Sequence, residues 1–311
     1  MILNISFIGN GGHAKRIKNV LHRLDISFNE VVFLRDILLS DQKSLIESDI
    51  IFITSPNNTH ASYLRDLSGI YKGYIYCEKP PVNELKDVDL FDKIDHRKCF
   101  FGFNLRYSKI HTILSKYILD FRLGGLVSLK VHVSYPFSIK KEYLSSWKSD
   151  ITKSPQGVVE NLAIHYIDMC IEFLGDISRA WINSINISGN GSAADTANIV
   201  FKHSKCGVSN IFSSYATTYQ EEIYFTFEGG DVVYNGESFA VYSPRESFDN
   251  NGLAIRPKIS KEQKLYCDTL YNDSIEKCVQ YFIGVVLDKK DFNVSIFNQS
   301  RKTIEAMLNV K

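Results

Sequence analysis

Two side chains in this sequence could together move a proton and stabilise a negative charge. Lys79 lies in the segment CEKPP (residues 77–81), and His165 lies in GVVENLAIHYID (residues 157–168). The two prolines restrict the chain around Lys79, so its ammonium group could be held beside a reacting oxygen. An imidazole has an ordinary pKa of about 6.5, which suits proton removal near neutral pH. Taken alone, Lys79 could equally be an exposed lysine in a loop.

A polar stripe runs along the predicted helix that contains His165. The segment is mostly apolar and continues through MCIEFLG, yet Asn161, His165, Asp168 and Glu172 recur at steps of four, three and four. This spacing places all four on one side of a helix. The stripe is either a solvated face or, at Asn161 and His165, the wall of a substrate pocket. Asp168 would then pair with His165 or cap a group behind it.

A glycine-rich turn follows the first apolar segment. The sequence FIGNGGHAKR contains Gly9-x-Gly11-x-x-Ala14 between a predicted strand and a predicted helix. Gly9 permits a tight turn, Gly11 lets the backbone approach a pyrophosphate, and Ala14 lets helix and strand pack closely. The helix N-terminus would face the phosphates with free N–H groups. The alternative is a glycine turn without a ligand. The predicted cofactor contacts here are Gly9, Gly11, Gly12, His13 and Ala14.

The residues at the end of the second predicted strand decide whether NAD or NADP would fit. Asp36 could bind the ribose 2′-hydroxyl of NAD, whereas Arg35 could bind the 2′-phosphate of NADP. We expect NAD, with NADP possible. The third strand ends in TSPNNTH, which could line the cofactor crevice or simply cap the following helix. The further predicted cofactor contacts are Ser55, Pro56, Asn57, His60, Glu78 and Lys79.

Strand and helix signals alternate through residues 1–103 and then change. This βαβ rhythm predicts a Rossmann domain with a doubly wound parallel sheet. Residues 104–311 predict an α+β domain with an open-faced, mainly antiparallel sheet. In LVSLKVHVSYP, for example, Val127, Leu129, Val131 and Val133 alternate with polar residues. Two helical stretches are predicted at the end, over roughly 261–288 and 294–309.

The composition excludes several classes of partner. The 311 residues include 36 basic and 35 acidic side chains, so no strong net charge favours nucleic acid or an anionic membrane. No apolar stretch is long enough to span a bilayer, and the first residues do not resemble a signal peptide. The six cysteines are scattered, which predicts neither a metal site nor a disulfide framework. We therefore expect a cytoplasmic protein with reduced thiols.

Taken in order, the motifs identify a family. GxGxxA, SPNNTH, CEKP and NLAIHYID together resemble the Gfo/Idh/MocA oxidoreductases over nearly the whole chain. The resemblance implies hydride transfer between a nicotinamide and a sugar-like alcohol or ketone, with Lys79 catalytic and His165 as acid/base. The family's usual Asp and Gly are Asn161 and Ala163 here, and an amide cannot carry a proton. Asn161 could still orient a substrate.

The resemblance extends to one branch and suggests a substrate. The chain is similar to UDP-N-acetylglucosaminuronate 3-dehydrogenases of surface-polysaccharide synthesis, which oxidise a sugar C3 hydroxyl. Contacts to the diphosphate or carboxylate of such a sugar are expected from Arg106, Lys109, Trp147 and Lys148, although each could be a surface or packing residue. The alternatives are an NADP-dependent sugar ketoreductase and a non-catalytic member that binds the cofactor. The family also implies a homodimer or homotetramer.

Overall fold

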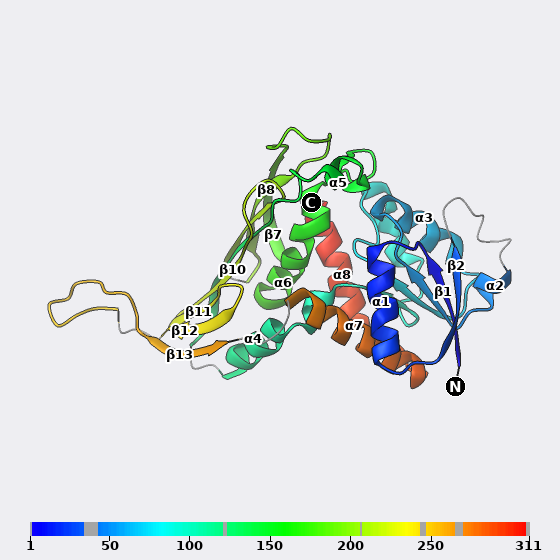
Figure 1. The fold of residues 1–311 in the computed structure, drawn as a ribbon. Helices are drawn as coiled ribbons and strands as arrows, with labels where there is room; N and C mark the ends of the chain where they lie inside the picture. The colour runs from blue at the N-terminus through cyan, green and yellow to red at the C-terminus, as the bar shows by residue number, and fades with distance from the viewer. Residues whose placement is uncertain are drawn as a thin grey trace.

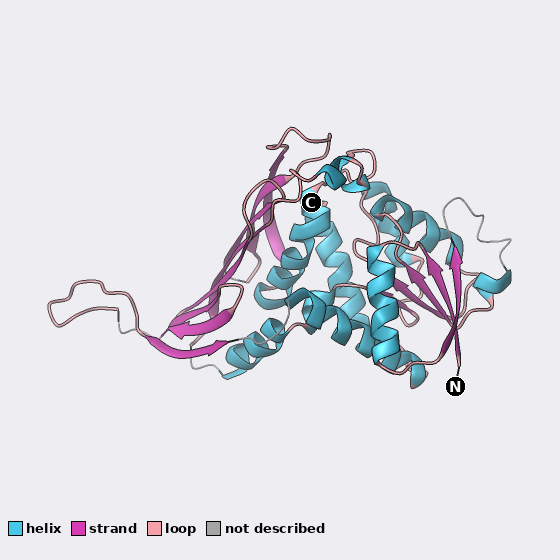
Figure 2. Ribbon diagram, in the orientation of Figure 1, coloured by secondary structure: helices cyan, strands magenta, loops and turns pink. Residues whose placement is uncertain are grey.

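The protein folds around two β-sheets with helices packed between them and on the outer side of the first (Figure 1). The computed structural model describes residues 2–33, 43–120, 123–205, 207–242, 247–264 and 270–308. One sheet has five parallel strands, and the other has eight strands that are mainly antiparallel (Figure 2). The predicted fold class is therefore confirmed.

The parallel sheet has the strand order β2-β1-β3-β4-β5. Its strands are short and apolar, as expected for a sheet covered on both faces. Side chains of alternate direction pack on one face against α1 (Gly12–Arg23) and α7 (Leu270–Leu287). Those on the other face pack against α3 (Asn57–Leu67) and α8 (Val294–Met307). The strands are β1 (Leu3–Ile8), β2 (Phe28–Phe33), β3 (Ile50–Ile53), β4 (Tyr74–Cys77) and β5 (Cys99–Phe101).

The helices of this first unit follow its strands along the chain. They are α1 (Gly12–Arg23), α2 (Lys43–Ile46), α3 (Asn57–Leu67) and the 3-10 helix η2 (Leu85–Asp92). Helix α7 (Leu270–Leu287) comes from the other end of the sequence, yet its Phe282 ring lies 5.5 Å from the Phe52 ring of the sheet. The domain boundary at residue 103 remains a prediction.

The second sheet has the order β13-β12-β11-β10-β6-β9-β8-β7, with β6 and β9 parallel and the other neighbours antiparallel. Helices cover only one of its faces (Figure 2). The other face exposes apolar side chains such as Trp181 and Val208. Its strands are β6 (Leu126–Ser134), β7 (Ile177–Ile185), β8 (Thr196–His203), β9 (Val208–Ser214), β10 (Gln220–Phe227), β11 (Gly230–Tyr234), β12 (Ser238–Tyr242) and β13 (Ile259–Lys264).

The remaining helices connect the two sheets. They are η3 (Asn104–Tyr107), α4 (Lys109–Asp120), α5 (Lys141–Leu144), η4 (Trp147–Ser149), the π-helical turn η5 (Val159–Ala163), α6 (Ile164–Leu174) and α8 (Val294–Met307). Helix α6 lies between the sheets, with α8 beside it (Figure 1). Among the described helices, none has the length and apolar character that a membrane span requires.

Two expectations about the second unit need correction. The predicted helix over 261–288 begins only at α7, because residues 261–264 pair with β12 as the edge strand β13. Their Lys, Glu and Gln side chains favour a helix locally, but strand pairing overrides this preference. Val127 is 45% exposed, whereas Leu129, Val131 and Val133 are buried as expected. The pairing of β6 with β10 shifts register near the start of β6, which removes Val127 from the regular alternation.

Candidate functional site

A cleft of about 760 Å³ opens at the carboxyl ends of β1, β3 and β4. Gly9 has a φ of +100°, and a Cβ there would lie 2.8 Å from the Ser55 nitrogen, so this turn requires glycine. Gly11 precedes α1 without a side-chain cap, and a Cβ on Gly11 or Gly12 would meet nothing within 4 Å. Free N–H groups of the helix therefore face open space. This cradle fits a diphosphate.

The other predicted cofactor residues separate into two groups. Ser55, Pro56 and Asn57 line the cleft, together with His13, Glu78 and Lys79. Ala14 is fully buried under the turn, as its packing role requires. His60 does not line the cleft, because its ring is buried with each nitrogen 2.8 Å from a backbone oxygen, of Pro80 and of Ser55.

His60 therefore joins the loops that follow β3 and β4 and does not contact the cleft, which corrects its predicted role. The expected positions of Arg35 and Asp36 lie outside the described residues.

Glu78 and His13 form a polar pair in the wall of the cleft. Nε2 of His13 lies 2.6 Å from Oε1 of Glu78. Burial raises the pKa of Glu78, but the neighbouring His13 and Lys79 outweigh this effect and hold that pKa below its usual range. Glu78 therefore supplies a negative charge directly beside Lys79.

Lys79 follows β4 and points towards the helix that carries His165. Its Nζ donates a 2.7 Å hydrogen bond to the backbone oxygen of Asn161. Burial and the nearby charge of Lys148 lower the pKa of Lys79 to about 8, although Glu78 and Glu160 oppose this shift. The sequence prediction of a lysine held rigidly at the sheet edge agrees with this placement.

The polar stripe of the helix is buried along its first turns. Asn161, His165 and Asp168 are all less than 9% exposed, which excludes a solvated face for these three. Burial and the neighbouring Lys79 lower the pKa of His165 well below its usual value, so the imidazole is neutral near pH 7. A neutral imidazole can accept a proton.

The Asn161 amide is held by the protein itself. Its Nδ2 donates to Ser154 Oγ and to the Gly157 oxygen, both at 2.7 Å, and its Oδ1 accepts a 3.4 Å hydrogen bond from Asn57. Both of its N–H groups are thus used. The residue lines the site with both N–H groups used, so any hydrogen bond that orients a substrate would be accepted by its Oδ1, and this role stays a prediction.

A second cavity of about 430 Å³ contains His165 and adjoins the first. Four residues line both cavities and so mark their junction: Arg16, Lys79, Lys148 and Asn161. The second cavity continues over the covered face of the eight-stranded sheet, where Val133 of β6 and Glu221 of β10 contribute to its wall. A cofactor in the first cavity and a small molecule in the second would therefore meet beside Lys79.

Trp147 and Lys148 lie in this region, and their predicted contact with substrate stays a prediction. Both line the first cavity, and Lys148 also lines the second. Nζ of Lys148 lies 5.7 Å from the Trp147 ring centre and 5.8 Å from that of Phe137. Burial and the charge of Arg16 lower the pKa of Lys148 to about 8. The junction is therefore rich in cations, which suits an anionic ligand.

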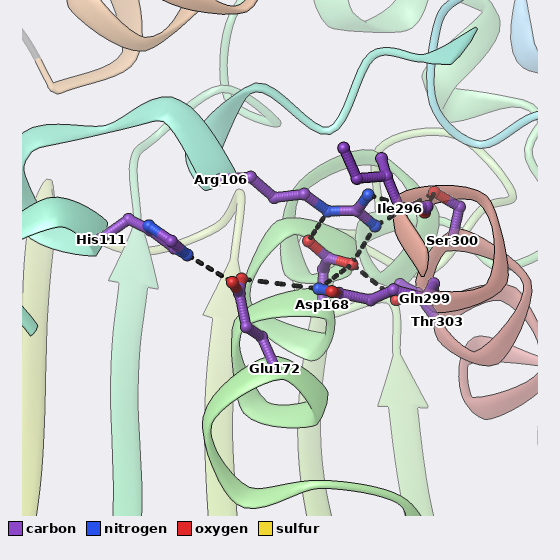
Figure 3. Close-up of polar contacts among 8 residues, drawn as sticks. All are labelled: Arg106, His111, Asp168, Glu172, Ile296, Gln299, Ser300 and Thr303. Carbon is purple, nitrogen blue, oxygen red and sulfur yellow. Dashed lines mark hydrogen bonds and ion pairs between the residues drawn. The ribbon is translucent and has the colours of Figure 1, made fainter. Parts of the chain in front are cut away.

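Arg106 does not reach either cavity. Its guanidinium donates to both carboxylate oxygens of Asp168 at 2.7 and 2.6 Å, to the Ile296 oxygen and to Ser300 (Figure 3). The carboxylate also accepts from Thr303 at 2.7 Å. These contacts join η3, α6 and α8, so Arg106 is a structural residue and its predicted substrate contact is corrected.

The same network occupies the end of the polar stripe. Asp168 pairs with Arg106, while Glu172 lies 2.5 Å from Nε2 of His111 (Figure 3). Lys109, at the start of α4, is not among the residues that line the two cavities. The stripe therefore divides into a site half and a structural half.

Three residues that line or adjoin the site were not selected from the sequence. Arg16 lies one turn after the glycine motif, which could have indicated a phosphate contact. Glu160 is fully buried beside Asn161. An acidic residue within an otherwise apolar segment could have indicated a residue of the site. Glu221, Ile223 and Phe225 occupy every second position of β10 and so share one face of the strand. Because Ile223 and Phe225 are buried, this pattern places the Glu221 carboxylate on the covered face.

Comparison with known proteins agrees with this architecture. Residues 113–233 match the model of the GFO/IDH/MocA C-terminal domain. This segment is therefore similar to a Gfo/Idh/MocA C-terminal domain. It contains η5, α6 and strands β6 to β10, and thus His165 and most of the second cavity.

The Gfo/Idh/MocA likeness extends to individual proteins. Over 205 residues the chain is 26% identical to the glucose-6-phosphate 3-dehydrogenase of Bacillus subtilis (strain 168), covering 58% of this chain and 57% of that protein. The chain spans about half the length of the curated relatives it matches.

Solved structures extend the likeness to the whole fold. An oxidoreductase from Thermotoga maritima is 15% identical, with a TM-score of 0.79 and coverage of 99% of this chain and 95% of that one. Levoglucosan dehydrogenase in complex with NADH and L-sorbose is also 15% identical, with a TM-score of 0.77 and coverage of 99% and 97%. At this identity the likeness concerns the fold alone.

Proposed function

We propose that the protein is an NAD(P)-dependent dehydrogenase that oxidises a sugar CH–OH group. The observation that carries this proposal is the junction of the two cavities at Lys79, with His165 in the second cavity. The proposal is supported by the glucose-6-phosphate 3-dehydrogenase relative and by the fold shared with a levoglucosan dehydrogenase.

The residues of the site suit a proton transfer coupled to hydride transfer. A nicotinamide cofactor bound in the first cavity would supply the acceptor for the hydride that leaves the sugar carbon. The neutral imidazole of His165 takes the hydroxyl proton, and the ammonium of Lys79 stabilises the oxygen as negative charge develops. The charged carboxylate of Glu78 favours the charged form of Lys79 against the cost of its burial. Asn161 holds Lys79 in place through its backbone oxygen.

The glycine cradle would hold the diphosphate of the cofactor through backbone N–H groups. We propose NAD as the cofactor, with NADP as the alternative, since Asp36 and Arg35 favour different ribose substituents. An NADP-dependent ketoreductase would use the same residues in the opposite direction, with His165 returning the proton.

The substrate proposal has two candidates that share an anionic group. The first is a hexose phosphate oxidised at C3, in line with the name of the Bacillus relative. The second is a nucleotide sugar such as a UDP-N-acetylhexosaminuronate in surface-polysaccharide synthesis, which the motif resemblance suggested. Arg16 and Lys148 at the junction suit either anion. A cytoplasmic homodimer or homotetramer remains a prediction.

The test is a turnover assay that follows NADH formation. The panel contains D-glucose, D-glucose 6-phosphate and UDP-N-acetylglucosaminuronate, each with NAD and with NADP. We expect one sugar to be oxidised, and Lys79→Ala and His165→Ala each to lower kcat by about 100-fold or more without loss of NADH binding. Lys109→Ala, outside both cavities, is the control.

Two results would contradict the proposal. One is NADH binding with no turnover of any sugar in either direction, which would favour a non-catalytic member of the family. The other is full turnover by Lys79→Ala or His165→Ala.

A further inference from the structure

The side chains that line the second cavity are positively charged in one part and negatively charged in another. The residues shared with the first cavity include the cations Arg16, Lys79 and Lys148. Glu221, Tyr166 and Tyr219 line the second cavity only, on the side formed by β10 and α6. A molecule in this cavity therefore extends from a cationic part towards a carboxylate.

Glu221 is held in a defined orientation. Tyr166 donates a 3.0 Å hydrogen bond to its Oε1, and Tyr219 donates a 3.3 Å hydrogen bond to its Oε2. The residue lies opposite Val133 in the β6–β10 pairing, and Val133 also lines the cavity. A carboxylate has about four lone-pair sites, so two remain for a ligand after the two tyrosine hydroxyls are counted.

We infer that Glu221 is a specificity-determining residue that accepts hydrogen bonds from uncharged hydroxyl groups of the sugar and excludes an anionic substituent from its part of the cavity. The inference rests on the proposed function and names its substrate class. The substrate is a sugar with one anionic substituent, which lies beside Arg16 and Lys148. A sugar with anions at both ends, such as a uronate carrying a phosphate at C1, would place one of them against Glu221.

Two sugars separate these cases in a kinetic test of the full chain with its nicotinamide cofactor. D-Glucose 6-phosphate carries one anionic group, and α-D-glucuronate 1-phosphate carries anionic groups at both ends. Like charges brought together in a buried site cost several kcal/mol, so we expect wild-type kcat/KM to favour the first sugar by about 100-fold or more. In Glu221→Gln this ratio falls by about tenfold or more, because the amide keeps an acceptor oxygen but loses the charge.

The matched control is Glu222→Gln. Glu222 is the next residue of β10, so its side chain points to the opposite face of the sheet. The same chemical change there leaves the ratio unchanged. If Glu221→Gln fails to fold, Lys148→Gln tests the other part of the cavity: KM rises about tenfold for glucose 6-phosphate and stays within about twofold for D-glucose.

The possible failures are distinguishable. An unchanged ratio in Glu221→Gln, or a wild-type preference for the sugar with two anions, overturns the inference and leaves the dehydrogenase assignment intact. NADH binding without turnover of any sugar overturns the proposed function, and this inference with it.

Discussion

The charge of Lys79 depends on its immediate neighbours. Its pKa of about 8 places the change from ammonium to amine within an accessible pH range. Oxidation requires the ammonium form, so kcat/KM should fall as pH rises through about 8. Lys148→Gln removes the neighbouring positive charge, which is the second-largest cause of the lowered pKa of Lys79. We therefore expect the alkaline limb of the pH profile, where kcat/KM falls, to move upward by about 0.5 to 1 pH unit.

The measurement is the pH profile of kcat/KM for the oxidised sugar, which reports groups in the free enzyme. Lys109→Gln, also a lysine but outside the two cavities, is the control and should leave the limb in place. A limb that stays at the same pH in Lys148→Gln would argue against electrostatic coupling between the two lysines.

Glu160 is a buried acid that should make stability depend on pH. Burial raises the pKa of Glu160 to about 8, and this effect outweighs the neighbouring polar groups of Ser154, Asn83 and Asn57. Between about pH 4.5 and 8 the native state therefore holds a proton that the unfolded chain releases, and wild-type stability falls as pH rises. Gln cannot ionise, so Glu160→Gln should gain about 2 to 4 kcal/mol over wild type by pH 8.5.

Urea unfolding at pH 5.5 and 8.5 measures this difference. Glu222→Gln, on the open face of the second sheet, serves as the matched control. Parallel stability curves for wild type and Glu160→Gln would show that the carboxyl group is already ionised at neutral pH.

At this scale the sequence predicted residue types better than their partners. The sequence predicted that His165 lines a substrate pocket facing Lys79, and both residues line the second cavity. Trp147 and Lys148, expected as substrate contacts from the branch resemblance, line the first cavity. The pairing of Arg106 with Asp168 could not be predicted from the sequence, because the two residues are 62 positions apart and meet only through tertiary packing.

At the scale of elements, the chain enters the helix that carries His165 through one glycine. Gly157 has a φ of +53°, and a Cβ there would lie 2.1 Å from the Ala194 backbone oxygen. Gly157→Ala should therefore lower the free energy of unfolding by about 2 to 4 kcal/mol, from backbone strain and displacement of neighbouring backbone. It should also lower kcat, because Asn161 Nδ2 donates to the Gly157 oxygen.

Gly175 at the other end of the helix provides the comparison. Its φ is +84°, but a Cβ there would meet nothing within 4 Å. Gly175→Ala should cost about 1 to 3 kcal/mol from backbone strain alone, less than Gly157→Ala, and leave kcat unchanged. Chemical denaturation and turnover of both variants test the argument, and equal losses would show that close approach at residue 157 does not matter.

Element types followed from local pattern wherever pattern and packing agreed. The alternation in β6 predicted its buried face, and the helix over 294–309 was found as α8. Strand β13 was missed because all six of its residues are exposed, so no apolar periodicity indicates a strand. Pairing with β12 alone explains it.

At the scale of the whole molecule, helices bring distant parts of the chain to one site. Helix α7 follows the second sheet in sequence but completes the cover of the first, where it packs against α1. The order of elements along the chain could not predict that α7 packs on the first sheet. The position of the two cavities relative to each other depends on such packing and was not available from local sequence.

The buried Arg106–Asp168 pair is the polar link within this helical layer (Figure 3). Both side chains are less than 10% exposed, and the pair joins η3, α6 and α8. Asp168→Asn leaves the guanidinium buried without a counter-charge, which should lower the free energy of unfolding by about 3 to 5 kcal/mol. Neither residue lines the cofactor cleft, so the affinity for NADH should stay within about twofold of wild type at low temperature.

The surface pair of Asp176 with Lys302 gives a matched control on the same helix α8. Its two side chains are 61% and 49% exposed, so Asp176→Asn should change stability by less than about 1 kcal/mol. Thermal and urea unfolding of both variants, with NADH titration below the unfolding transition, separates the two roles. If Asp168→Asn weakened NADH binding while remaining as stable as wild type, the pair would belong to the binding machinery and not to the scaffold that positions it.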